Sequence, residues 1–413
     1  MDFGFSEDQK IFRDSLRDFL EKEIVPIADE KEKIGKPATR EEAIDIGKRF
    51  KKIGLSPDIE DIGGFASDLS TVGLVAEELG RVSPSVALLV GYSMSIPAVI
   101  QFLPDGMDLK ERLLPKMKRS ELVATYALTE PEAGSDSRAI KSTAVLDGDE
   151  YVINGSKTWA SNGPISNLAL LVAKVESGEQ EMFFIDREQS PYDSNELGHL
   201  GLKFGSTGEL FLEDCRVPAE NSLTNVIGGI MSSGKMEELT KDLEMPSDSH
   251  VMDLFGMMNP VSLVLAFLRI GMAFMATGIS QACLEASVKY SKERVAFGKP
   301  IGKFQLIQNM LFKIATITET SRLLGYKALD LAANGDPGFR MASSMAKAYA
   351  CKEVVDAASY AIEIHGGNGL SDELPIERYF RDARMMSIPD GTTNMNTLVV
   401  GRELLGPGYS AYV

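Results

Sequence analysis

The hydrophobic pattern of the chain changes twice, and this order restricts the folds that the chain can adopt. Apolar residues recur at helical spacing in the first part, as in 71–82 and 85–102. From Leu122 short β-rich runs follow, punctuated by Gly, Asp and Asn. They lie at 142–146, 151–154, 168–173, 182–185 and 209–211. Long helical patterns then return over 265–294, 307–334 and 339–366. This order predicts an α+β fold with an all-β domain between two helical ones.

The predicted domains are 1–121 (helical), 122–223 (a small antiparallel sheet or barrel) and 224–413 (helical). Ser6 and Gln9 form a capping box that predicts where the first helix begins.

Composition excludes several classes of protein. The chain has 43 Lys and Arg against 60 Asp and Glu, a net charge of −17, which disfavours nucleic acid as a partner. Its three cysteines and three histidines show neither disulfide nor metal-ligand spacing, so no metal site is expected. The N-terminus lacks a secretion signal, so a cytoplasmic location is expected. The apolar region 261–283 carries Arg269 near its middle, which favours a buried helix over a membrane span.

Four motifs carry chemical information. The first, 126–136, reads Tyr-Ala-Leu-Thr-Glu-Pro-Glu-Ala-Gly-Ser-Asp and predicts a tight turn that presents hydroxyls and amides. The second is Trp-Ala-Ser-Asn-Gly at 159–163. The third is Arg-Val-Ala-Phe-Gly-Lys-Pro-Ile at 294–301, followed by Gln305. The fourth runs from Glu363 through His-Gly-Gly-Asn-Gly to Asp382.

In this order the motifs resemble the acyl-CoA dehydrogenase family of flavoproteins, over nearly the whole chain. The resemblance implies a helical N-terminal domain, an antiparallel β middle domain and a C-terminal four-helix bundle. It also implies FAD, an acyl-CoA substrate, an electron-transfer flavoprotein as electron acceptor, and a homotetramer. The segment of about 224–260 is longer than the family usually has, and is either a solvated helix and loop or a wall over the acyl end of the pocket.

The resemblance assigns cofactor contacts residue by residue. Thr129 and Ser161 match residues that bond the flavin ring, and Trp159 matches an aromatic residue that packs on it. Arg294, Phe297 and Gln305 match residues that reach the FAD of a neighbouring subunit. Glu363 stands where glutamine is common. The full set is Leu128, Thr129, Trp159, Ser161, Arg294, Phe297, Gln305, Glu363, Gly366, Gly367, Thr392 and Asn394.

Ser135, Arg269 and Gly391 match family positions that contact the substrate. The residue before Gly391 departs from the family pattern. The family commonly has a catalytic glutamate before Gly-Thr, whereas this chain has Asp390, one methylene shorter. Some members carry the base just before the arginine on the helix, but that position is Leu268 here. A general base must reach the proton next to the thioester carbonyl.

Three interpretations of Asp390 remain open. It is the base for a closer or differently shaped acyl group, such as a cyclic or branched one; it only shapes the pocket; or dehydrogenation has been lost and the scaffold only binds. A flavin-dependent oxidase related to nitroalkane oxidase, which also uses an aspartate near this place, is a further alternative.

Overall fold

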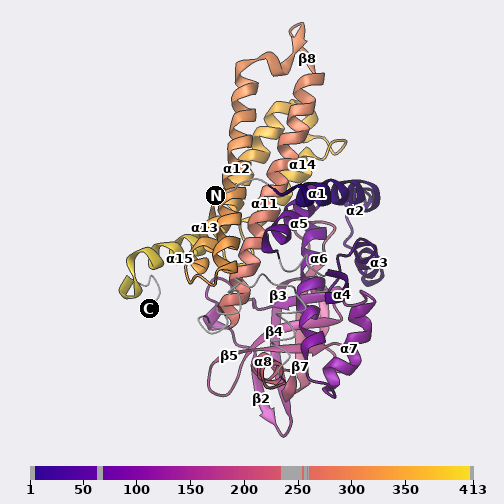
Figure 1. Ribbon diagram of the computed structural model, residues 1–413, viewed down its shortest axis with the longest axis vertical. Coiled ribbons are helices and arrows are strands. Elements are labelled where there is room, and N and C mark those ends of the chain that lie inside the picture. The colour runs from indigo at the N-terminus through magenta and orange to yellow at the C-terminus, as the bar shows by residue number, and fades with distance from the viewer. Residues whose placement is uncertain (1–4, 63–67, 234–253, 255–257, 259, 410–413) are drawn as a thin grey trace.

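The computed structural model describes residues 5–62, 68–233 and 260–409, together with 254 and 258. Figure 1 shows an elongated molecule in which the sheet lies at one end and the tips of the long C-terminal helices lie at the other. The predicted succession of helices, strands and helices is confirmed.

The N-terminal part is helical. Its helices are α1 (Glu7–Phe19), α2 (Val25–Ile34), α3 (Arg40–Lys51), α4 (Ile59–Ile62), α5 (Leu69–Val82), α6 (Pro84–Ala98) and α7 (Asp108–Lys118). A π-helical turn, η1 (Leu20–Ile24), joins α1 to α2. The capping box is confirmed, since Ser6 Oγ accepts from Gln9 N at 3.1 Å and Gln9 Oε1 accepts from Ser6 N at 2.9 Å.

The middle part is a seven-stranded sheet. Its strands are β1 (Ala124–Ala127), β2 (Thr143–Asp147), β3 (Glu150–Ser161), β4 (Leu168–Lys174), β5 (Gln180–Asp186), β6 (Asp193–Glu196) and β7 (Thr207–Pro218). The order is β1-β4-β2-β3-β7-β6, with β5 paired to β4. Most pairs are antiparallel, as expected, but β4 is parallel to both β1 and β2.

The C-terminal part is helical again. Its elements are α8 (Leu223–Ser232), α11 (Pro260–Glu293), α12 (Gln305–Ala333), α13 (Phe339–His365), α14 (Ile376–Met386) and α15 (Thr393–Leu405). The short hairpin of β8 (Val295–Ala296) and β9 (Lys299–Pro300) joins α11 to α12 at the tip of the molecule (Figure 1). The predicted long segment 224–260 lies mostly outside the described residues; α8 is its described beginning.

Two described helical segments, Pro84–Phe102 and α11, are long and apolar enough to cross a membrane by length and composition alone. In α11, 61% of the most apolar window is buried inside the protein, and the helix packs against α5, α12 and α13. This arrangement fits the expected buried helix.

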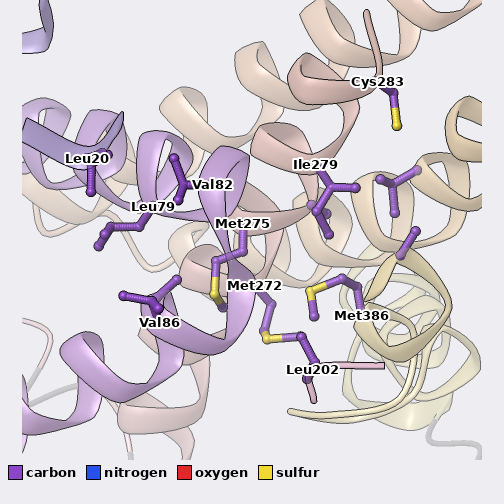
Figure 2. Packing of buried hydrophobic residues seen from close by; sticks show 14 of the residues in the cluster. Leu20, Leu79, Val82, Val86, Leu202, Met272, Met275, Ile279, Cys283 and Met386 are labelled. Carbon is purple, nitrogen blue, oxygen red and sulfur yellow. The ribbon is translucent and has the colours of Figure 1, made fainter. Parts of the chain in front are cut away.

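One hydrophobic core joins the three parts. Leu79 of α5, Met272 of α11 and Met386 of α14 belong to it, and so does Leu202 from the loop before β7. Figure 2 shows these side chains converging between the helices. Because a loop of the middle part and both helical parts share this core, the three parts are packed against one another.

Candidate active site at the turn between α14 and α15

Asp390 lies in the turn that joins α14 to α15. Its φ is 54°, and that of Gly391 is 86°, so two consecutive residues adopt the left-handed conformation. Glycine adopts it freely, whereas a residue with a side chain does so at a cost. Thr392 then caps α15, because its hydroxyl accepts from Met395 N at 3.2 Å.

Side chains from three helices hold the carbonyls of this turn. Arg269 Nε on α11 donates to Asp390 O at 3.1 Å. Lys347 Nζ on α13 donates to Gly391 O at 2.7 Å. Asn396 Nδ2 on α15 donates to the same Gly391 oxygen at 2.7 Å. These bonds fix the unusual backbone, although the Asp390 side chain takes part in none of them.

The Asp390 carboxyl is partly buried and makes no hydrogen bond or ion pair with the described residues. Burial raises its pKa, and the nearby charges of Lys347 and Arg269 act in the opposite direction. Tyr92 of α6 and Tyr126 of β1 also lie near it: burial and the Asp390 charge both raise the pKa of each phenol. The carboxyl group is therefore desolvated and lies near two tyrosines and two cations.

The backbone N–H of Asp390 also makes no hydrogen bond with the described residues. A free donor beside the carboxyl can bind an oxygen on which negative charge develops. The turn thus presents a proton acceptor and an oxyanion donor from one residue.

A second group of predicted residues lies at the edge of the sheet. Thr158 N donates to Thr129 O at 2.9 Å, and Thr125 Oγ1 donates to Ser161 O at 2.8 Å, so the loop after β1 and the end of β3 are joined. The hydroxyls of Thr129 and Ser161 have no partner among the described residues. Trp159 has a φ of 59° beside a bulge of β3, and it is 54% exposed.

A buried ion pair holds the loop after β1 in place. Lys157 Nζ lies 2.6 Å from Glu130 Oε1 and also donates to Leu128 O at 3.2 Å. Glu130 accepts from the backbone N–H and the hydroxyl of Ser142 as well, at 3.0 and 2.5 Å. These contacts fix Leu128 and Thr129 on the protein, with Trp159 next to them in β3.

The other predicted cofactor residues lie at the opposite end of the molecule. Arg294, Phe297 and Gln305 are exposed around the β8–β9 hairpin, and Phe297 is 95% exposed. Glu363, Gly366 and Gly367 lie near the same tip, since His365 stacks on Tyr290 of α11 with ring centroids 4.3 Å apart. Figure 1 shows β8 at the tip of the long helices and β3 in the sheet, away from that tip, so within one chain the two groups do not meet.

Of the predicted substrate residues, Ser135 is exposed in the loop after β1. Arg269 is directed to the turn, with Nη1 also 3.2 Å from Ser344 Oγ, and it pairs with no carboxylate in the described part of the chain. Of the remaining residues, Asn394 is exposed in the first turn of α15.

Three arginines that the sequence did not single out form a cationic cluster near Ser135. Arg340 of α13 lies 3.1 Å from Glu403, and Arg402 lies 3.2 Å from the same carboxylate. Burial lowers the pKa of Arg340, and the nearby Arg402 and Arg138 charges lower it further. Arg138 has no ion pair among the described residues. The cluster draws on the loop after β1, on α13 and on α15.

Sequence reasoning also missed Lys347, Tyr92, Tyr126 and Asn396. A signal existed for Lys347: it is a single charge in the apolar run Met-Ala-Lys-Ala-Tyr-Ala-Cys at 345–351. Such a charge in a buried helix needs a partner. No local pattern marks the tyrosines, because their role arises only where α6 and β1 meet the turn.

Comparison with known proteins shows the family to which the chain belongs. The N-terminal, middle and C-terminal domain patterns of acyl-CoA dehydrogenases match residues 6–121, 125–215 and 258–405. Cyclohex-1-ene-1-carbonyl-CoA dehydrogenase of Geobacter metallireducens is 34% identical over 97% of this chain and 99% of its own. The chain therefore belongs to the acyl-CoA dehydrogenase family. It is an oxidoreductase of that family, which confirms the fold and the enzyme class expected from the motifs.

Solved structures are similar over the same length. One, described as the electron transferring flavoprotein of Acidaminococcus fermentans, has 30% identity, a TM-score of 0.82, and coverage of 98% of this chain and 100% of that chain. An acyl-CoA dehydrogenase from Bacillus anthracis, complexed with FAD, has 25% identity and a TM-score of 0.78, with coverage of 97% and 67%.

Proposed function

We propose that the protein is an FAD-dependent dehydrogenase of a CoA thioester in which Asp390 removes the α-proton. The observation that carries this proposal is the Asp390 turn, where a part-buried carboxyl group lies beside a backbone N–H and neither has a hydrogen-bond partner among the described residues. A desolvated carboxylate is a stronger base than one in water, because burial destabilises its charge.

The surface at the end of β3 fits FAD. Trp159 leaves an aromatic face uncovered, and the hydroxyls of Thr129 and Ser161 are available as hydrogen-bond partners for a flat polar ring. A Cβ added at Gly134 would meet no atom within 4 Å, so the loop also leaves open space for a ligand. FAD, when bound, supplies the acceptor for the hydride that leaves the β-carbon.

In the proposed reaction the chain supplies the proton acceptor, and bound FAD would supply the hydride acceptor. The proton of the α C–H bond passes to the Asp390 carboxylate, and the electron pair of that bond forms the new α,β double bond. FAD held at Thr129, Trp159 and Ser161 would accept the hydride of the β-carbon. During the transfer the thioester oxygen gains negative charge, which the Asp390 N–H stabilises. The product is an unsaturated thioester, and Asp390 returns its proton to solvent after release.

The cationic cluster of Arg138, Arg340 and Arg402 supports a CoA thioester. CoA carries phosphates, and arginine forks bind phosphate oxygens well. The protein as a whole has a charge of −17 and repels anions, so a local group of arginines is the feature that such a ligand requires.

For the acyl group we infer a compact, uncharged shape, cyclic or branched. Asp390 is one methylene shorter than glutamate, so the α-carbon must come closer to the turn. Tyr92 and Tyr126 narrow the space beside it, and α6 carries no charged residue that could bind a second carboxylate. The Geobacter relative, by its name, acts on a cyclic acyl thioester.

We infer further that the protein is a homotetramer that passes electrons to an electron-transfer flavoprotein. Phe297 and Leu306 near the tip of the bundle are 95% and 78% exposed, and Leu404 and Leu405 on the protruding α15 are 69% and 63% exposed (Figure 1). Apolar surface of this kind is typical of an interface. A partner's tip would also bring Arg294 and Gln305 to the dinucleotide end of this chain's FAD.

Light scattering tests the assembly. Phe297→Asp should lower the molar mass and release FAD, whereas Val145→Asp, at an exposed position on β2 at the other end of the molecule, should change neither. A monomer that keeps all its FAD would contradict the tetramer. Hydrogen peroxide produced at the turnover rate would contradict the flavoprotein acceptor and favour the oxidase alternative.

The base is tested by anaerobic flavin bleaching with a panel of straight, branched and cyclic CoA thioesters. Asp390→Asn should retain the flavin spectrum and thioester binding but bleach about 10²–10⁴ times more slowly. It should also abolish deuterium exchange of acetyl-CoA α-protons in D2O, which needs the base but no hydride transfer. Asp382→Asn, at another buried carboxyl group, is the control and should bleach normally. Wild-type bleaching by Asp390→Asn would disprove the assignment.

A further inference from the structure

Lys347 is a buried lysine that pairs with no carboxylate in the described part of the chain. Its side chain is fully buried, and its Nζ donates to one described acceptor, Gly391 O, at 2.7 Å. Lys157 is equally buried but lies 2.6 Å from Glu130. Lys157 therefore has a carboxylate partner, whereas Lys347 has none among the described residues.

Keeping Lys347 unpaired is costly, because a buried ammonium loses its hydration. Burial accordingly lowers its pKa. An apolar side chain of the same length would avoid this cost. The position of the amine at the Asp390 turn therefore calls for a functional explanation.

We propose that Lys347 is a positioning residue for proton abstraction, which anchors the Gly391 carbonyl and whose positive charge stabilises the Asp390 carboxylate. The inference rests on the proposed role of Asp390. Lys347 stays protonated throughout: the substrate proton moves to Asp390, and no bond to the amine forms or breaks.

Two neighbouring residues allow the hydrogen bond of Lys347 to Gly391 O to be distinguished from the effect of its positive charge. Asn396 donates to the same Gly391 oxygen at 2.7 Å but is neutral. Arg269 is charged but binds the preceding carbonyl, at 3.1 Å. The other described titratable groups near the Asp390 carboxyl are the phenols of Tyr92 and Tyr126 and the thiol of Cys351, which are neutral because burial raises the pKa of each. Among the charges that lower the pKa of Asp390, Lys347 contributes more than Arg269.

The positive charge of Lys347 should change the pH dependence of the bleaching rate in a known direction. Removing the Lys347 cation raises the pKa of Asp390, so a larger fraction of the base is protonated at any acidic pH. The acidic limb of the bleaching rate should therefore move to higher pH. Removing a neutral donor at the same carbonyl loosens the turn but leaves this limb in place.

The experiment compares Lys347→Met, Lys347→Gln and Asn396→Leu in the flavin-loaded protein, with the rate expressed per bound flavin. Lys347→Met should slow bleaching about 10²-fold at neutral pH, because a displaced base loses its alignment. Its acidic limb should rise by about one pH unit or more. Lys347→Gln restores a donor without charge, so it should recover part of the rate and keep the displaced limb. Asn396→Leu should slow bleaching with an unmoved limb.

Thioester affinity should change less than about threefold in all of them, since the effect falls on the chemical step. A Lys347→Met protein that bleaches at the wild-type rate with an unmoved limb would overturn the proposal. So would a loss of rate that follows flavin content alone. Should Lys347→Met fail to fold, Lys347→Gln carries the same test through its limb. If Asp390→Asn is inactive while both Lys347 variants behave as wild type, only this inference fails and the proposed base stands.

Discussion

The Oδ1 atom of Asp382 on α14 accepts a hydrogen bond from the backbone N–H of Leu202 at 2.6 Å. Leu202 is in the left-handed conformation, with a φ of 59°, in the loop that precedes β7. The bond thus joins the C-terminal helices to the middle sheet. A Cβ added at the adjacent Gly201 would come within 2.5 Å of Arg381 O, so the two backbones are also in close contact.

The cations near Asp382 do not neutralise its carboxylate. Arg378 lies 2.6 Å from Asp29 and Arg381 lies 2.6 Å from Glu377, so both cations near Asp382 are shared with other carboxylates. Burial, followed by the charge of Glu32, raises the pKa of Asp382 from 3.8 to about 7. The folded protein therefore binds a proton here that the unfolded chain releases near pH 4.

We expect the contribution of Asp382 to the free energy of unfolding to fall as pH rises from about 4 to 7, and to be constant above that window. Asp382→Asn keeps the acceptor for Leu202 N–H and removes the charge. It should abolish this part of the slope and stabilise the holoprotein at pH 8 by about 2–4 kcal/mol. Urea unfolding at several pH values measures it. Asp18→Asn, at an exposed carboxylate, should leave the slope unchanged, and an equal slope in Asp382→Asn would refute the explanation.

Gly278 allows α11 to approach α5 closely. A Cβ placed on it would lie 2.1 Å from Glu77 O and 2.5 Å from Arg81 N, both of which are backbone atoms. Gly278→Ala should therefore destabilise the protein by about 1–3 kcal/mol through overpacking. Gly271→Ala on the same helix meets no atom within 4 Å, and should be neutral or stabilising by up to about 1 kcal/mol. Thermal unfolding of the two variants decides; similar melting temperatures would count against the packing argument.

The cationic cluster predicts how substrate size affects binding. Arg138→Ala should raise the KM for a CoA thioester about fivefold, corresponding to the ~1 kcal/mol of an exposed charge contact. It should not change the KM for the same acyl group on pantetheine, which lacks the nucleotide phosphates. Arg216→Ala, which removes an exposed arginine paired with Asp147, is the control and should affect neither substrate. Equal effects of Arg138→Ala on both thioesters would place the phosphates elsewhere.

The length of the base predicts substrate choice. In Asp390→Glu the added methylene should push the carboxylate toward the acyl group, so the rate with the best wild-type thioester should fall by about 10-fold or more. Straight-chain thioesters, which can lie farther from the turn, should gain relative to it. Ratios of kcat/KM across the panel measure this, and an unchanged order of substrates would show that length at this position does not set specificity.

The sequence predicted the helices and strands well, because each element contains its own cap or hydrophobic pattern. The capping box at Ser6 and the helical pattern over 307–334 placed helix ends correctly to within a few residues. The parallel pairing of β1 with β4 was not predictable, because it depends on where the chain returns after the β2–β3 hairpin. The site shows the same limit. The sequence singled out Asp390, but the bond from Arg269 spans 121 residues and that from Lys347 spans 44, and no local pattern reports such contacts.

The hydrogen bonds that Arg269, Lys347 and Asn396 donate to the turn between α14 and α15 all end on main-chain oxygens. The architecture thus specifies where a side chain at 390 begins, but not which side chain it is. A single codon change could exchange one acid for another while the frame persists. On such a frame, new specificities can evolve by altering the length of the reactive group and the walls opposite it, without the fold having to be stabilised anew each time.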